Sequence, residues 1–175
     1  MALNENIPPI KIMGFKSDIT DVMATINLIN KLSKDSRCVV QLMDARGVAG
    51  QKHVLHATIH AINAFKRKNN ISNDLGMEIC VRVSAQRQIS KAIKILGLKE
   101  GLTEICAVIV EFNQDSDMGI AENELNNIFL KDDTVLEPDD AVLKDIYGIK
   151  NEEIDMDKGL LYTLLERTTL LILDA

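Results

Sequence analysis

Residues 103–112, with the sequence TEICAVIVEF, form the most strand-like run in this chain of 175 residues. Most of them are apolar and several are β-branched, a composition that favours a buried strand. Three further runs, at residues 10–15, 38–43 and 77–83, are predicted to be strands as well. The run at 38–43 is almost continuously apolar at its start, so we expect it to lie near the centre of the sheet.

Helices are predicted between and after these strands. The first is expected to begin at a cap formed by Ser17 or Asp18. Its apolar face would consist of Ile19, Val22, Met23, Ile26 and Ile29. The other helices are expected at residues 51–68, 86–96, 121–130, between Pro138 and Gly148, and at 158–167.

This order of elements predicts a mixed α/β (α+β) fold. We expect a mostly antiparallel sheet of four to five strands flanked by helices, with a helical C-terminal third. Residues 1–175 are expected to form a single domain, with the sheet-containing core at about 8–112 and a helical extension at about 113–175.

Composition narrows the class of protein. Hydrophobic residues make up 46% of the chain and aromatic residues 3%, so we expect an aliphatic core and little stacking of bases on aromatic rings. The three cysteines lie in apolar runs, which predicts buried free thiols in a reducing compartment. The sequence has no signal-peptide pattern and no uncharged run of the ~20 residues that a membrane span needs. We therefore expect a cytoplasmic protein without a membrane partner.

Charge is distributed unevenly along the chain, whose net charge is −6. Residues 46–99 contain ten lysines and arginines against two acidic residues, whereas residues 112–157 contain fourteen acidic residues against three lysines. A dense cationic segment in an acidic protein is typical of a surface that binds a polyanion. We expect the cations of residues 46–99 to converge into one cradle for a ribose-phosphate chain.

The helix predicted at 86–96 carries part of that charge. Its buried stripe would consist of Ile89, Ala92, Ile93 and Leu96. Arg87, Lys91 and Lys94 would line another face, and Gly97 would end the helix. Two interpretations are open: a half-buried helix with a solvated cationic side, or a helix that contacts phosphates.

All three histidines lie on the helix predicted at 51–68. His53, His56 and His60 are three or four residues apart, so they share one face. His56 and His60 have the spacing of a helical metal-binding pair, but this helix offers no third ligand, and we expect no metal site. A polar groove rim that continues into residues 66–68 and an ordinary solvated face are the alternatives, together with a metal- or ligand-binding domain built around the histidines.

Motifs of nucleophilic catalysis and nucleotide binding are absent from the sequence. There is no Gly-x-Ser-x-Gly elbow and no Gly-rich phosphate loop followed by Lys-Ser or Lys-Thr. We therefore expect a protein that is not an enzyme, with no cofactor and no small-molecule substrate.

The C-terminal helix is apolar over an unusually wide face. Leu160, Leu161, Leu164 and Leu165 form that face. Such a helix is either deeply buried or docked on a partner, and the sequence leaves both possibilities open.

Several short motifs occur together in a fixed order. They are QLMD at 41–44, VAG at 48–50 leading to His53, NIS at 70–72, LGME at 75–78, RQI at 87–89 and LER at 165–167. In this order they resemble the small kinase-associating subunit of the KEOPS complex, a family called the PRPK-binding protein in animals, over roughly residues 38–173. Gln86, Thr168 and Thr169 depart from the family pattern, and His56 and His60 are not part of it.

The resemblance implies a non-catalytic subunit. The KEOPS complex makes N6-threonylcarbamoyladenosine at the tRNA adenosine just 3′ of the anticodon. The chemistry belongs to a separate transferase subunit, supported by a small atypical kinase that acts as an ATPase. The family that this chain resembles binds that kinase, and its archaeal members also capture tRNA through the single-stranded 3′ CCA end.

From this resemblance we expect two sets of contacts in this chain, one with tRNA and one with the kinase. The cations expected at tRNA phosphates are Lys66, Arg67, Lys68, Arg82, Arg87, Lys91 and Lys94, and the polar side chains expected at bases are Asn70, His60 and Gln88. Leu160, Leu161, Leu164 and Leu165 are expected to dock on the kinase. The competing hypothesis is a protein-interaction module that regulates the kinase allosterically and never touches RNA.

Overall fold

The computed structural model of the protein describes the backbone of residues 6–173 and the side chains of residues 6–171. Within this range the chain forms a four-stranded antiparallel sheet with the strand order β2-β3-β1-β4. The strands are β1 (Ile10–Ile19), β2 (Val39–Asp44), β3 (Gly101–Val110) and β4 (Leu130–Lys131). The predicted α+β fold with an antiparallel sheet is confirmed, and β3 contains the run at 103–110 that predicted it.

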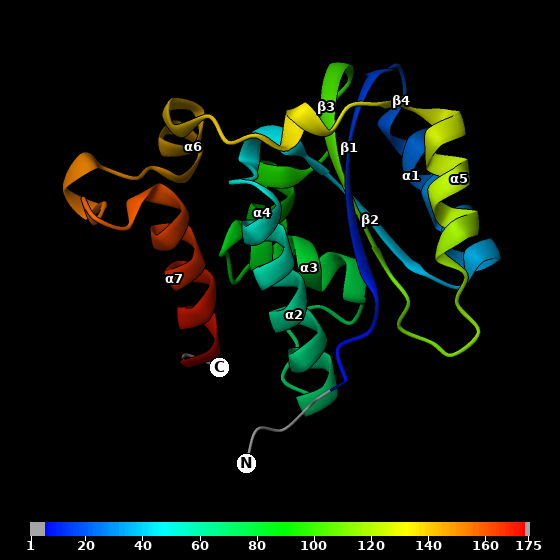
Figure 1. The fold of residues 1–175 in the computed structure, drawn as a ribbon, viewed down its shortest axis with the longest axis horizontal. Coiled ribbons are helices and arrows are strands. Elements are labelled where there is room, and N and C mark those ends of the chain that lie inside the picture. The colour runs from blue at the N-terminus through cyan, green and yellow to red at the C-terminus, as the bar shows by residue number, and fades with distance from the viewer. Residues whose placement is uncertain (1–5, 174–175) are drawn as a thin grey trace.

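Helices cover both faces of the sheet (Figure 1). On one face lie α1 (Val22–Ser36) and α5 (Met118–Ile128), and on the other lie α2 (Gln51–Arg67), α3 (Leu75–Ser84) and α4 (Ile89–Leu96). Alternate strand side chains supply the two layers of core, because successive side chains point to opposite faces. Phe15 and Ile105 pack with α1 and α5, whereas Cys106 and Val108 pack with α2 and α3.

The expectation that the second strand is central is wrong. In the described part of the chain, β2 pairs only with β3 and therefore lies at an edge of the sheet. Its apolar character has another cause, since α1 packs against one face of β2 while α3 and α4 pack against the other. Burial on both faces produces the same continuous apolar run as a central position does.

The prediction of a strand at 77–83 is also wrong, because these residues lie in the helix α3. Asp74 caps this helix by accepting a hydrogen bond from the backbone N–H of Met77 at 2.8 Å. Almost every side chain of α3 is buried, so the helix shows no polar face from which its period could be read. Cys80 consequently lies on a helix, and the predicted burial of all three free thiols is confirmed.

Several element boundaries differ from the prediction. β1 continues to Ile19 because residues 17–19 pair with residues 101–103 of β3. The first helix therefore begins at Val22, and its cap is Asp21 instead of Ser17 or Asp18. The helix predicted at 86–96 begins at Ile89, after Gln88 as its N-cap residue.

The C-terminal third is mostly helical, as expected, with β4 as the exception. After β4 come two short 3-10 helices, η2 (Asp133–Leu136) and η3 (Asn151–Glu153), and two α-helices, α6 (Asp140–Tyr147) and α7 (Gly159–Leu173). α6 ends at Gly148, whose φ of 60° is the left-handed conformation that favours glycine.

Tyr147 ties this C-terminal region to the core. Its buried hydroxyl donates a hydrogen bond of 2.6 Å to the carbonyl of Gly47, in the 3-10 helix η1 (Ala45–Gly47) that precedes α2. The guanidinium of Arg167 on α7 donates to the carbonyl of Tyr147 at 3.2 Å. These bonds link η1, α6 and α7.

His53 forms a second buried link. Its Nδ1 accepts a hydrogen bond from the backbone N–H of Ala49 at 2.9 Å, so Nε2 carries the proton and donates to the carbonyl of Val83 at 3.0 Å. Burial lowers the pKa of His53 to about 4, so the ring is neutral near pH 7. His53 thus connects the start of α2 to the end of α3.

We expect Tyr147→Phe to lower the free energy of unfolding by about 1–3 kcal/mol, because it leaves the buried Gly47 carbonyl without this donor. Urea unfolding followed by circular dichroism measures the change. Tyr162→Phe is the matched control, since the side chain of Tyr162 is exposed, and it should change the stability by less than about 0.5 kcal/mol. Equal effects of the two substitutions would contradict the link.

We also expect stability to fall as the pH is lowered from about 6.5 to about 4. The pKa of His53 is lower in the folded protein than in the unfolded chain, so the unfolded chain binds the proton first. The stability that the neutral ring contributes is complete above pH 6.5, and about 3 kcal/mol of it is lost by pH 4. An NMR titration of the His53 ring tests this directly, and a midpoint near 6.5 would contradict it.

Candidate functional site

A basic depression lies between η1, α4 and α6. It has a volume of about 540 Å³. Its lining residues are Asp44, Arg46, Gln86, Lys91, Lys94, Ile95, Lys99, Val142, Asp145 and Ile146. Four cations and two carboxylates thus face a shared concave surface, and one of the two carboxylates, that of Asp44, is buried.

Asp44 at the end of β2 organises one side of the basic depression. Its carboxylate accepts hydrogen bonds from Nε and Nη2 of Arg46 at 3.1 and 2.7 Å, and from Nζ of Lys99 at 3.2 Å. Burial by itself would raise the pKa of Asp44, but the hydrogen bonds from Arg46 and Lys99 outweigh it and hold the pKa below its ordinary value. Asp44 therefore stays ionised and fixes both cations at the rim.

α4 supplies the other two cations. Lys91 and Lys94 lie on its exposed side and form no ion pair among residues 6–171. Ala92 and Leu96 anchor the opposite side of the helix in the core. The predicted buried stripe is therefore confirmed for Ala92 and Leu96 and wrong for Ile89 and Ile93, whose side chains are exposed. The predicted cationic face is confirmed, and its lysines remain available to an anionic ligand.

The expected single cradle is wrong, because most cations of residues 46–99 fall into two separate clusters. Lys66, Arg67 and Lys68 lie at the C-terminal end of α2, whereas the basic depression adjoins η1 at its N-terminal end. α2 has 17 residues, so about 25 Å of helix separates the two clusters. Side chains of the core lie between them.

Arg82 is a further correction. Its side chain is 2% exposed and its guanidinium pairs with Glu78 at 2.7 Å inside the core. The carboxylate of Glu78 also accepts hydrogen bonds from the backbone N–H groups of Ile71 and Ser72. Arg82 therefore stabilises the fold and is not placed to meet a phosphate.

The expected base-contacting residues do not lie together. Gln88 is exposed at the start of α4, near the basic depression. Asn70 is half-buried in the turn after α2, where its amide donates to the carbonyl of Ser72 at 2.8 Å. Burial lowers the pKa of His60 to about 4, with His56 adding to the effect, so His60 is neutral near pH 7.

The histidine pair lies on α2 where α7 packs against it. The ring centroids of His56 and His60 are 4.4 Å apart, and Nε2 of His56 lies 3.1 Å from Oγ1 of Thr169. Among the described residues, no group of three potential metal ligands occurs. Two departures from the family pattern, His56 and Thr169, thus contact each other.

α7 buries part of the leucine face that was expected to meet a partner. Leu160 and Leu164 lie in a core cluster with Tyr147, which corrects their assignment to the kinase surface. Leu161 and Leu165 are half-buried at the edge of that contact. The exposed side of α7 instead presents Tyr162, 41% exposed, and Leu170, 48% exposed.

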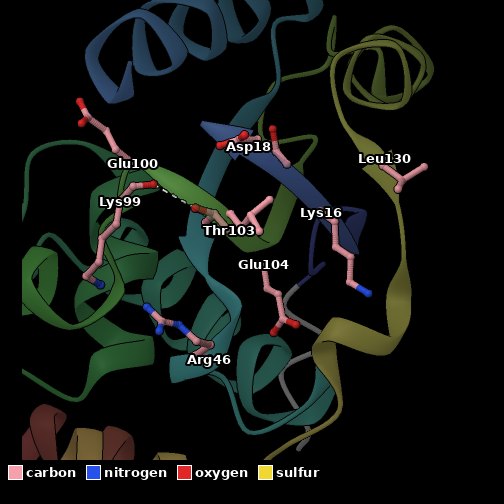
Figure 2. A pocket seen from close by; sticks show the side chains of 10 residues that line it. Lys16, Asp18, Arg46, Lys99, Glu100, Thr103, Glu104 and Leu130 are labelled. Carbon is pink, nitrogen blue, oxygen red and sulfur yellow. Dashed lines mark hydrogen bonds between the residues drawn. The ribbon is translucent and has the colours of Figure 1, made fainter. Parts of the chain in front are cut away.

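A second and larger hollow of about 810 Å³ adjoins the basic depression and shares Arg46 and Lys99 with it (Figure 2). It lies where the sheet extends beyond the helices. Its charges are balanced, with Lys16, Arg46 and Lys99 against Asp18, Glu100 and Glu104. A hollow with equal numbers of both signs offers no net attraction for a polyanion, so the basic depression is the better anion site.

Sequence reasoning missed Arg46 and Lys99 as members of the basic depression. The available signal was the Asp44-x-Arg46 spacing directly after a strand, because a carboxylate at that position holds the following arginine in a tight turn. Lys99 gave no such signal, since its contact with Asp44 joins residues 55 positions apart.

Comparison with known proteins places these observations in a family. No helix in the described part of the chain is both long and apolar enough to cross a bilayer. Residues 18–170 match the family model described as kinase binding protein CGI-121. The regulatory protein Cgi121 of Methanocaldococcus jannaschii is 48% identical over 68 residues, which cover 39% of this chain and 43% of that protein. Because the family model spans most of the sheet and the helices that flank it, the chain belongs to the CGI-121 family of kinase-binding proteins.

Proposed function

We propose that this protein is the non-catalytic, kinase-binding regulatory subunit of the KEOPS complex. The match to the kinase-binding family over residues 18–170 is the observation that carries the proposal. The partner is the small atypical kinase that acts as the ATPase of the complex. The same subunit captures tRNA, by its 3′ CCA end, for N6-threonylcarbamoyladenosine formation.

The basic depression supports the tRNA part of this proposal. Lys91 and Lys94 lie beside Arg46 and Lys99, and Arg87 and Gln88 are exposed at the start of the same helix. Phosphate contacts of this kind position the RNA and make its affinity strongly dependent on salt. Lys66, Arg67 and Lys68 then contact a different part of the tRNA, about 25 Å away along α2.

The exposed side of α7 supports the kinase part. Tyr162 and Leu170 project from it, with Leu161 and Leu165 half-buried beside them. Exposed aromatic and aliphatic side chains next to a buried helix face are typical of an anchor for a partner. α7 packs on α2 and α3, so this surface does not overlap the basic depression and both ligands can bind together.

A protein-only regulator of the kinase is the second candidate. One observation favours it: α6, which lines the basic depression, carries acidic residues, with Asp145 in the lining and Asp139 and Asp140 exposed at the start of the helix. These carboxylates reduce the attraction for a polyanion. The experiment on Lys91 and Lys94 below separates the two candidates.

We expect Lys91→Glu with Lys94→Glu to weaken tRNA binding by about tenfold or more at 0.15 M salt, because two phosphate contacts become repulsive. A filter-binding assay across a salt series measures this, with intact tRNA and with tRNA lacking its 3′ CCA. Lys31→Glu with Lys34→Glu is the matched control, since these two exposed lysines have the same spacing on α1.

Kinase binding by both double variants should equal that of the unaltered protein. Unchanged tRNA affinity in the Lys91/Lys94 variant would remove the tRNA part of the proposal and leave the protein-only regulator. Equal affinity for intact tRNA and for tRNA lacking its 3′ CCA would contradict recognition of the CCA end.

We expect Tyr162→Ala and Leu170→Ala each to weaken binding of the kinase subunit by about tenfold, because each removes an exposed apolar contact of α7. Isothermal titration calorimetry with the purified kinase measures the change. Leu130→Ala on β4 is the control for Leu170→Ala, since Leu130 is also exposed but lies away from α7. Equal affinity of all three variants would place the kinase elsewhere.

A further inference from the structure

The outer edge of β2 lies at the floor of a groove that the proposed function does not use. Two hollows of about 150 and 280 Å³ adjoin along this edge and share Asn30, Val40 and Gln41. Ile26 and Ile29 of α1 form one wall, and residues of α3 and α4, among them Met77 and Ile93, form the other. We call these two hollows the edge groove.

Within residues 6–173, no strand pairs with the backbone at this edge. β2 pairs with β3 on one side only. The carbonyl of Leu42 instead accepts a hydrogen bond of 2.9 Å from the side-chain amide of Gln41, which takes the place that a strand N–H would occupy. Because outward-facing groups alternate along an antiparallel strand, the N–H and C=O of Val40 face the same side as those of Leu42.

The opposite edge of the sheet is formed by β4, which has two residues. β4 pairs with β1, and beyond it the N–H of Asp132 donates to the carbonyl of Gly14 at 2.9 Å. The N–H of Gly14 donates in turn to the carboxylate of Asp133 at 2.8 Å. The edge at β2, with six residues, is thus the longer template for a further strand.

The walls of the edge groove determine what kind of molecule fits it. Lys34 and Asp74 are the charged residues in its lining, one on each wall, so the groove carries no net charge. The edge groove therefore offers no net electrostatic attraction for a polyanion. The lysines of α4 line the basic depression instead. Ile26 and Ile93 are both more than 40% exposed, which leaves apolar surface for a ligand to cover.

We propose that the edge groove binds an extended peptide segment of a partner protein, which adds a strand to β2 over Val40–Leu42. Helices on opposite faces of the sheet leave room between them in the plane of the sheet, and an added strand lies ~4.8 Å from β2. The segment is apolar on both faces, since its alternate side chains meet Ile26 on α1 and Ile93 on α4. A second copy of this protein does not fit, because its own β2 edge is recessed between the same helices.

A random heptapeptide display library, selected on the full-length protein and counter-selected on the Ile26→Lys, Ile93→Lys variant, tests this proposal. We expect enriched peptides with at least three consecutive apolar residues. In NMR titrations the synthetic peptides should shift the backbone amides of Val40 and Leu42. Ile26→Lys should weaken peptide binding by about tenfold. Leu28 is equally exposed on α1 but lies outside the groove, so Leu28→Lys should leave the affinity of the peptides unchanged.

Alternate N-methylation of the peptide backbone separates strand addition from simple apolar contact. Methylation removes the N–H donors of the peptide and keeps its side chains. Because two hydrogen bonds are lost, we expect the affinity of the peptide to fall by about tenfold or more. Gln41→Ala should strengthen binding severalfold, because it frees the Leu42 carbonyl.

Four results would overturn the proposal. They are no enrichment over the counter-selection variant, equal affinity of the methylated peptide, dimerisation of the free protein that Ile93→Lys abolishes, and a shift of the Val40 and Leu42 amides by a CCA-ended RNA oligomer. The first three results do not depend on kinase or tRNA binding. The fourth would assign the edge groove to RNA and leave tRNA capture standing, so this proposal and the proposed function fail separately.

Discussion

The antiparallel pairing of β1 with β3 is the contact on which the rest of the molecule depends. It joins residues 10–19 to residues 101–110, with β2 and the first four α-helices between them in the chain. The loop before β3 is thereby brought beside the end of β2, where Lys99 meets Asp44. Burying the carboxylate of Asp44 would be costly in isolation, and the hydrogen bonds from Arg46 and Lys99 offset that cost. One buried acid thus places half of the cations of the basic depression.

Hydrogen bonds at the C-terminal end of α3 position the C-terminal region of the chain. Helix termini leave carbonyls without partners inside the helix, and the end of α3 is buried. The carbonyl of Val83 accepts a hydrogen bond from His53 and lies 3.5 Å from the Tyr147 hydroxyl, and the carbonyl of Arg82 accepts a hydrogen bond from Thr168 on α7. The bond from Thr168 turns this side of α7 towards α3, and Leu164, one turn earlier on the same side, is buried while Tyr162 is exposed. Thr168, a departure from the family pattern, therefore has a structural use.

α4 separates two kinds of surface. Its lysines face the basic depression towards α6, while Ile93 faces the edge groove towards α1. α7 provides a third surface on another side of α2. This separation allows the proposed subunit to hold a nucleic acid, a kinase and a peptide segment at the same time, because none of the three surfaces shares a residue with another.

The sequence by itself determined the α+β class, the existence of the strand β3, the cationic face of α4 and the family. Each of these rests on local patterns: a run of apolar β-branched residues, a helical period, or motifs in a fixed order. Tertiary structure alone decided that residues 77–83 are helical, that β2 is an edge strand, and that Arg82 and Leu164 are buried. The physical reason is that complete burial removes the polar face from which a period is read, and that contacts such as Asp44 with Lys99 join residues far apart in the chain. Convergence of charge depends on the path of the chain, so the distribution of cations in the sequence predicted their presence but not their division into two clusters.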